Sequence, residues 1–100
     1  MPARSSTKPA AGRPAPRSRV TLVAPIEQAG EVVATGDFTG WSYEGVALKR
    51  RKDGAWSKTL YLAPGRYEYR LLVDGSWSNN PAAEHAPNAF GSVNDVLVVP

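Results

Sequence analysis

The stretch "RYEYRLLVDGSWS", residues 66–78, decides the fold class of this chain. Side chains on a β-strand point alternately to its two faces. The alternation over residues 66–73 therefore directs Arg70 outward and predicts four inward side chains: Tyr67, Tyr69, Leu71 and Val73. The dipeptide Asp74-Gly75 follows, and it favours a tight hairpin because both of its positions tolerate positive φ. The stretch thus predicts an antiparallel hairpin with one buried face.

Short runs rich in β-branched and aromatic residues, separated by turn signals, fill the chain on both sides of this hairpin. Such spacing is typical of an antiparallel sandwich. We expect seven strands, at residues 20–24, 31–35, 46–50, 55–62, 66–73, 76–78 and 92–99. Residues 79–91 are expected to form a long loop, and no helix longer than a turn is predicted. The pattern indicates an all-β fold with an antiparallel β-sandwich.

The first 19 residues differ in composition from the rest of the chain. They contain five basic residues and no acidic residue in a tract of Pro, Ala and Ser, and we expect them to form a disordered tail. Residues 20–100 contain seven of the twelve basic residues and all nine acidic residues, a net charge of −2. We therefore expect one domain over residues 20–100. A weak polyanion-binding arm and an organelle transit sequence are two further interpretations of the tail.

The residue inventory argues against an enzyme. The chain has no cysteine, which excludes disulfides, thiolate zinc sites and cysteine nucleophiles and fits a reducing compartment. A catalytic triad needs a histidine, and the single one, His85, lies in an expected loop, where a histidine is usually just solvated. Imidazole and thiolate ligands are too few for a metal site. Neither a phosphate-binding glycine loop nor a membrane-spanning run is present. We expect no catalysis, cofactor, metal or membrane association, and a cytoplasmic location.

The three tryptophans stand in different sequence surroundings. Trp56 shares its strand parity with Leu60 and Leu62, so it is expected in the core. Trp41 lies between Gly40 and Ser42, and Trp77 has serines on both sides, so both indoles are expected in turns near water. Each loop indole, taken alone, is equally consistent with a plug at the sandwich end and with a binding residue.

Four motifs occur in a fixed order along the chain: "GDFTGW" from residue 36, "EYR" from residue 68, "VDGSW" from residue 73 and "GSVN" from residue 91. Together they resemble carbohydrate-binding module family 48, the isoamylase N-terminal or early-set domain. The resemblance is closest to the glycogen-binding domain of the AMP-activated protein kinase beta subunit. It covers residues 36–99, most of the expected domain, and implies an immunoglobulin-like sandwich that binds α-1,4-glucans without catalysis.

The resemblance also implies a carbohydrate site made of Trp41, Arg70, Trp77, Phe90, Ser92 and Asn94. Trp41 and Trp77 match the tryptophans that stack on glucose rings in the family. Arg70 stands where the kinase-type domains have lysine, and Phe90 where they usually have leucine. Because an arginine fork differs in geometry from an ammonium and phenylalanine is bulkier than leucine, preference for ring size or branch points is not carried over.

We therefore expect a free-standing, non-catalytic module whose partner is an α-glucan polysaccharide or oligosaccharide. A sugar ring has apolar faces and a polar edge, so flat indoles with nearby hydrogen-bonding groups suit it. A second hypothesis is an adaptor that uses the same surface, or its sheet edges, for an unidentified protein partner. A nucleic-acid partner is the third and weakest, because residues 20–100 are net acidic.

Overall fold

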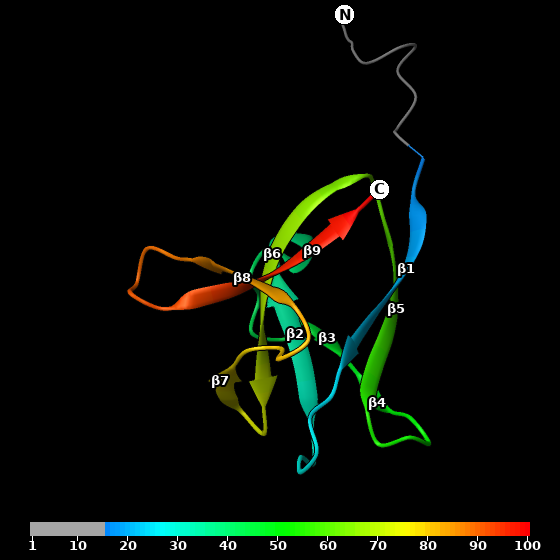
Figure 1. The fold of residues 1–100 in the computed structure, drawn as a ribbon, viewed down its shortest axis with the longest axis vertical. Helices are drawn as coiled ribbons and strands as arrows, with labels where there is room; N and C mark the ends of the chain where they lie inside the picture. The colour runs from blue at the N-terminus through cyan, green and yellow to red at the C-terminus, as the bar shows by residue number, and fades with distance from the viewer. Residues whose placement is uncertain (1–15) are drawn as a thin grey trace, which may run out of the picture.

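The computed structural model describes residues 16–100, and it is a sandwich of two antiparallel β-sheets (Figure 1). The predicted all-β immunoglobulin-like class is confirmed. The only helical turn in the described part of the chain is the three-residue 3-10 helix η1 (Asp37–Thr39). No helix among residues 16–100 has the length and apolarity needed to cross a membrane. The expected disorder of the tail concerns mainly residues 1–15, which lie outside the described residues.

The smaller sheet contains β1 (Ser18–Ala24), β5 (Trp56–Leu62) and β4 (Lys49–Arg50), in that order. Strand β1 begins two residues before the expected start at Val20, because Ser18 and Arg19 pair with Leu62 and Tyr61 of β5. In addition, Arg17 Nη1 donates a hydrogen bond of 3.0 Å to the carbonyl oxygen of Tyr61. The predicted boundary between tail and domain after residue 19 is thus placed too late. Backbone pairing with β5 outweighs the local composition, which favours a tail.

The larger sheet has the order β3 (Val46–Ala47), β2 (Val32–Gly36), β6 (Gly65–Val73), β9 (Val93–Val99) and β8 (Glu84–Pro87). The short strand β7 (Ser76–Ser78) pairs with the end of β6 through a hairpin. Asp74 and Gly75 both have positive φ, 51° and 83°, as the Asp-Gly signal predicts. One edge of β6 pairs with β9 over residues 65–69 and with β7 over residues 71–73. Arg70 therefore lies where the sheet changes from one neighbour to the other.

Two elements differ from the strands expected from the sequence. The predicted strand at residues 46–50 is divided between the two sheets, because the buried Leu48 separates β3 from β4 and its backbone N–H donates to Val32 O at 2.9 Å. The expected loop at residues 79–91 contains the edge strand β8. Pro87 is tolerated there because an edge strand leaves one row of backbone groups unpaired.

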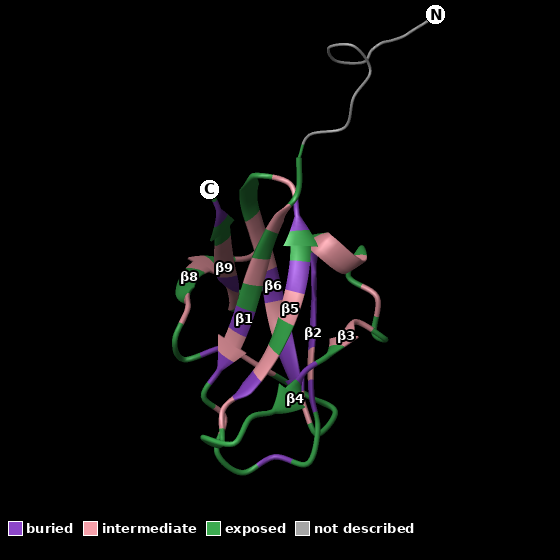
Figure 2. Cartoon of the chain, turned by 90° about the vertical axis from the view of Figure 1, so that its right-hand side faces the viewer, coloured by how far each residue is buried: buried purple, intermediate pink, exposed green. Residues whose placement is uncertain are grey.

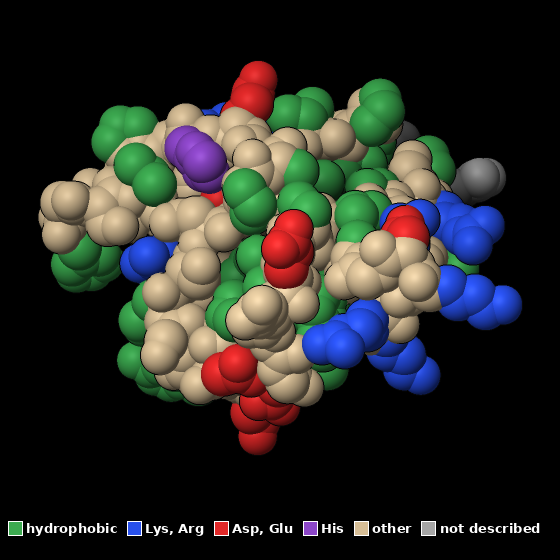
Figure 3. Space-filling view, turned by 60° about the horizontal axis from the view of Figure 1, so that its bottom comes forward, with side chains coloured by type: hydrophobic (Ala, Val, Ile, Leu, Met, Phe, Trp, Pro, Cys, Tyr) green, Lys and Arg blue, Asp and Glu red, His purple; other side chains and the backbone are tan. Residues whose placement is uncertain are grey.

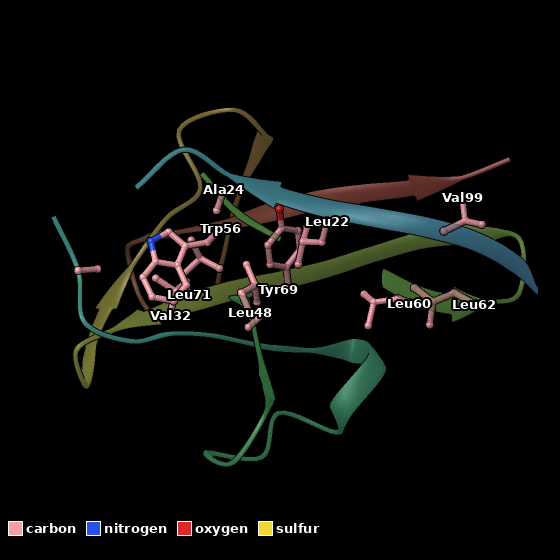
Figure 4. Close-up of a cluster of buried hydrophobic side chains, with 12 residues drawn as sticks. Leu22, Ala24, Val32, Leu48, Trp56, Leu60, Leu62, Tyr69, Leu71 and Val99 are labelled. Atoms are coloured by element: carbon pink, nitrogen blue, oxygen red, sulfur yellow. The ribbon is translucent and has the colours of Figure 1, made fainter. Parts of the chain in front are cut away.

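Both sheets contribute side chains to one hydrophobic core (Figures 2 and 4). More and less exposed positions alternate along β1 in Figure 2, as expected for a strand with one inward face. On β5, Trp56, Leu60 and Leu62 are buried. Trp56, Tyr69 and Leu71 are buried, which confirms their predicted inward placement, whereas Tyr67 and Val73 are half-buried and pack against the core. Each fully buried side chain of this size contributes about 1.5–3 kcal/mol to folding. The core thereby fixes β6, whose opposite face is free to carry a site.

Candidate functional site

A depression of about 920 Å³ lies on the outward side of β6, between β7, the segment after η1 and the loop that joins β8 to β9. Five of the six predicted site residues line it, namely Trp41, Arg70, Trp77, Phe90 and Asn94. Ser92 is exposed and is not among the lining residues. The volume falls at the upper end of the range for small-molecule sites, so there is room for more than one sugar-sized ring.

Trp41 is held in the depression by a carboxylate four residues earlier in the chain. Its Nε1 donates to Asp37 Oδ1 at 3.1 Å, and Asp37 Oδ2 accepts the backbone N–H of Glu68 at 2.8 Å. Asp37 thus links the indole to strand β6. Trp41 nevertheless remains 39% exposed, and its φ of 61° places it in the left-handed region. A bulky residue in that region is strained, because its Cβ approaches the neighbouring carbonyl oxygen.

Trp77 is positioned by the β6–β7 hairpin. It lies opposite Leu72 in the strand register, so both side chains are on the outward face, where Leu72 is buried. The guanidinium carbon of Arg70 is 5.3 Å from the centroid of the Trp77 ring, within cation–π range. Trp77 is still 43% exposed. Within residues 16–100 the Arg70 side chain makes no hydrogen bond, and its buried Nε is without a partner.

A row of hydrogen-bonded polar side chains forms one wall of the depression. Asn88 Nδ2 donates to Asn94 Oδ1 at 3.1 Å, and Asn94 Nδ2 donates to Glu68 Oε1 at 2.9 Å. Arg66 Nη1 donates to the other oxygen of Glu68 at 2.7 Å. The hydrogen bonds from Asn94 and then Arg66 lower the pKa of Glu68, so this carboxyl is ionised at neutral pH. Each amide keeps donor or acceptor capacity for a ligand hydroxyl.

The loop between β8 and β9 is organised by Asn88. Its Oδ1 accepts the backbone N–H groups of Phe90 at 2.9 Å and of Ser92 at 3.1 Å, while its own N–H donates to Ser92 O at 3.0 Å. This turn leaves Phe90 92% exposed at the rim. Ser92 therefore supports the loop through its backbone, and its hydroxyl is not brought to the depression with the other predicted residues.

Six lining residues were not predicted from the sequence: Asp37, Tyr43, Glu68, Pro87, Asn88 and Ala89. The signal that singled out Trp41 and Trp77, an aromatic residue in a turn-rich segment, applies equally to Tyr43. Asp37 and Glu68 come from different segments, and only the fold brings them together. No local pattern distinguishes such carboxylates from the other acidic residues of the chain.

The only histidine belongs to a polar cluster that does not line the depression. His85 Nε2 is 3.2 Å from Oδ1 of the buried Asp95, and Asn80 N donates to the other oxygen of Asp95 at 2.9 Å. Burial raises the pKa of Asp95, and hydrogen bonds from Asn80 and Asn79 partly oppose that effect. No group of three or more His, Cys, Asp or Glu side chains among residues 16–100 is placed to hold a metal ion.

The basic side chains of the domain are concentrated away from the depression, whose only basic lining residue is Arg70. Five of the seven basic residues of the predicted domain lie between residues 49 and 58, on β4, β5 and the turn between them in the smaller sheet. Figure 3 shows most lysine and arginine side chains of that view gathered on one side. The depression itself therefore lacks the row of cations that a phosphate backbone requires.

Comparison with known proteins gives a consistent set of relatives. The family model described as the glycogen recognition site of AMP-activated protein kinase matches residues 23–100. The chain is 41% identical over 71 residues to protein FLOURY ENDOSPERM 6, chloroplastic, of Oryza sativa subsp. japonica, which covers 71% of this chain and 13% of that protein. It is 37% identical over 97 residues to protein PTST, chloroplastic, of Arabidopsis thaliana, covering 88% of this chain and 32% of that protein.

A third relative has a name from protein kinase regulation. The chain is 29% identical over 87 residues to the 5'-AMP-activated protein kinase subunit beta-2 of Mus musculus, covering 87% of this chain and 31% of that subunit. The chain thus spans about a third or less of each of these relatives. What is similar is one module of longer proteins.

Proposed function

The chain belongs to the glycogen recognition site family of AMP-activated protein kinase, and we propose that it binds α-1,4-glucans through the exposed surfaces of Trp41 and Trp77. The proposed ligands are glycogen and starch-like polysaccharides, and the proposed role of the module is targeting or regulation. The observation that carries this proposal is that two partly exposed indoles from distant segments line one depression. A sugar ring stacked on either indole removes apolar surface from water.

The backbone strain at Trp41 supports a binding role for this residue. A non-glycine residue in the left-handed region costs on the order of 1–3 kcal/mol and persists where the surroundings hold it, often at functional sites. In this conformation the indole donates its hydrogen bond to the Asp37 carboxylate and lines the depression. A merely structural tryptophan at this position would gain little from such an arrangement, because it is 39% exposed.

The polar groups of the depression match a neutral, hydroxyl-rich ligand. Arg70 offers donors, Glu68 offers acceptors, and Asn94 offers both. Asp37 and Glu68 are two carboxylates against the single guanidinium of Arg70 among the lining residues, and this balance disfavours an anionic ligand. Binding of a glucan should therefore depend little on ionic strength.

Two carboxylates in one depression raise the question of glycoside hydrolysis. A glycosidase requires one carboxylic acid with a raised pKa to protonate the leaving oxygen. The pKa of Glu68 is lowered by its hydrogen bonds from Asn94 and Arg66, which is opposite to that requirement. Asp37 accepts two N–H groups, from Trp41 and from the backbone of Glu68. We therefore propose a non-catalytic module.

A protein-interaction adaptor is the second candidate. Two exposed aromatic side chains other than the tryptophans favour it. Phe90 is 92% exposed and Tyr43 is 76% exposed, and both line the same depression. Apolar side chains gathered at one surface are also typical of protein interfaces. We also propose a cytoplasmic location and, for the adaptor, a recruited protein partner.

Co-sedimentation separates the two candidates. The chain is mixed with glycogen or with insoluble amylose and centrifuged, with and without excess β-cyclodextrin. Glucan binding predicts that the protein pellets with the polysaccharide and that cyclodextrin returns it to the supernatant. Protein that stays in the supernatant with both polysaccharides would contradict the glucan proposal and favour the adaptor.

A further inference from the structure

Tyr43 is the aromatic lining residue that neither the motifs nor the family resemblance singles out. Its ring centroid is 5.9 Å from that of Trp77, and the two ring planes are inclined by 50°. Tyr43 is 76% exposed while Trp77 is 43% exposed, so Tyr43 covers Trp77 only in part. Most of the Tyr43 ring is therefore open to solvent next to Trp77 and is available to a ligand in the depression.

The segment that carries Tyr43 is fixed on both sides of that residue. The hydroxyl of Thr35 donates to Ser42 O, and Ser42 Oγ accepts the backbone N–H of Glu44 at 3.1 Å. Gly45 has a φ of 51°, and a Cβ there would lie only 2.5 Å from Ala34 O of β2. Only glycine allows this close approach, so Gly45 lets the segment pack directly against β2. The Tyr43 ring is thus presented from a fixed backbone, which lowers the entropic cost of binding.

We propose that Tyr43 forms an additional stacking subsite for a further glucose ring of the same glucan chain, next to the ring on Trp77. This inference rests on the proposed glucan function. Two inclined platforms suit a chain whose successive rings turn relative to one another, as in an α-1,4-linked glucan. The Tyr43 hydroxyl has no hydrogen bond within residues 16–100, so it can also bond a sugar hydroxyl at the platform edge.

The chain length of the ligand provides the test. Affinities for maltotriose and maltoheptaose are measured by calorimetry for the parent, Tyr43→Ala and Tyr43→Phe. Tyr61→Ala is the matched control, because Tyr61 is likewise an exposed tyrosine, at 61%, but lies on β5 of the smaller sheet. We expect Tyr43→Ala to weaken maltoheptaose binding by about two- to tenfold, as for the loss of one aromatic stacking contact. Maltotriose binding should change less than maltoheptaose binding, and Tyr61→Ala should leave both unchanged.

The possible results lead to different conclusions. An equal loss for the two ligands in Tyr43→Ala would mean that Tyr43 only supports Trp77, and no loss for either would mean that it is a bystander; both overturn the subsite. Tyr43→Phe should retain most of the chain-length effect, because it keeps the platform. If the parent binds neither ligand, the proposed function itself fails and the subsite fails with it. The thermal unfolding midpoint of each variant verifies that the exposed substitution leaves the fold intact.

Discussion

The Asp37 carboxylate is the group whose removal most directly tests how Trp41 is positioned. Asp37→Ala deletes the acceptor of the Trp41 Nε1 hydrogen bond at 3.1 Å and of the Glu68 N–H hydrogen bond at 2.8 Å. The indole then regains rotational freedom, and a ligand must order it on binding. That cost is about 0.5–1.5 kcal/mol for one side chain, which corresponds to a loss of affinity of about two- to tenfold.

The effect on folding stability should be smaller than or equal to that of one ordinary hydrogen bond. The Glu68 N–H is near solvent and can bond water once the carboxylate is absent, so we expect a loss of about 0.5–1.5 kcal/mol in the free energy of unfolding. Asp37→Asn keeps one carbonyl oxygen and loses the other, so its affinity should fall between those of the parent and Asp37→Ala. Calorimetry with β-cyclodextrin and urea unfolding provide the two measurements.

Asp53→Ala is the matched control for this experiment. Asp53 is also an exposed turn aspartate that accepts a backbone N–H, from Ala55 at 3.0 Å, and it pairs with Arg51 at 3.1 Å. It precedes β5 of the smaller sheet, so its substitution should leave glucan affinity unchanged. Asp37 does not position Trp41 for binding if Asp37→Ala binds β-cyclodextrin as tightly as the parent although Trp41→Ala has lost binding. The same conclusion holds if Asp53→Ala weakens binding as much as Asp37→Ala does.

Three further predictions concern stability. Trp56→Ala should lower the free energy of unfolding by about 3–5 kcal/mol because Trp56 is buried in the core; unchanged denaturant unfolding would contradict that placement. Trp41→Gly should unfold at a higher urea concentration than Trp41→Ala, since a φ of 61° suits glycine; the opposite order would exclude backbone strain. Burial raises the pKa of Asp95 above its ordinary value of 3.8, so its contribution to stability is complete below that value and is lost as pH rises through the folded-state pKa. The stability of the parent relative to Asp95→Asn should therefore decrease between pH 3 and pH 7, and an increase would show that the pKa is lowered.

Local patterns predicted the parts of the fold whose side chains alternate between core and solvent. The inward placement of Tyr69 and Leu71 and the tight turn at Asp74-Gly75 follow from strand periodicity and turn chemistry, and both are confirmed. Strand β8 has no such periodicity, and it forms because its backbone pairs with β9 at the sheet edge. Residues 18–19 likewise join β1 through pairing with β5. These elements depend on partners that are distant in sequence, so composition alone indicates a loop or a tail.

The candidate site was predictable to the extent that its residues occur in recognisable motifs. Five of the six residues named from the sequence line one depression, and their roles in binding remain predictions. Strand alternation alone marks Glu68 only as an outward position, and the fold is needed to bring it between the Asn94 amide and Arg66. Asp37 can hold the Trp41 indole because the chain turns through η1 and brings Trp41 Nε1 within hydrogen-bonding distance of the carboxylate. Such contacts arise from the close approach of separate segments, which a single sequence does not encode locally.

Calorimetric titration of the parent, Trp41→Ala and Trp77→Ala with β-cyclodextrin is the clearest test of whether the two indoles bind a glucan. Neither indole belongs to the buried core, so both variants should remain folded, with thermal unfolding as the check. Glucan binding by the two indoles predicts measurable binding by the parent, nearly complete loss in each variant, and little change in parent affinity with added salt because the ligand is uncharged. Absence of parent binding at millimolar cyclodextrin, or parent-like binding by both folded variants, would contradict it.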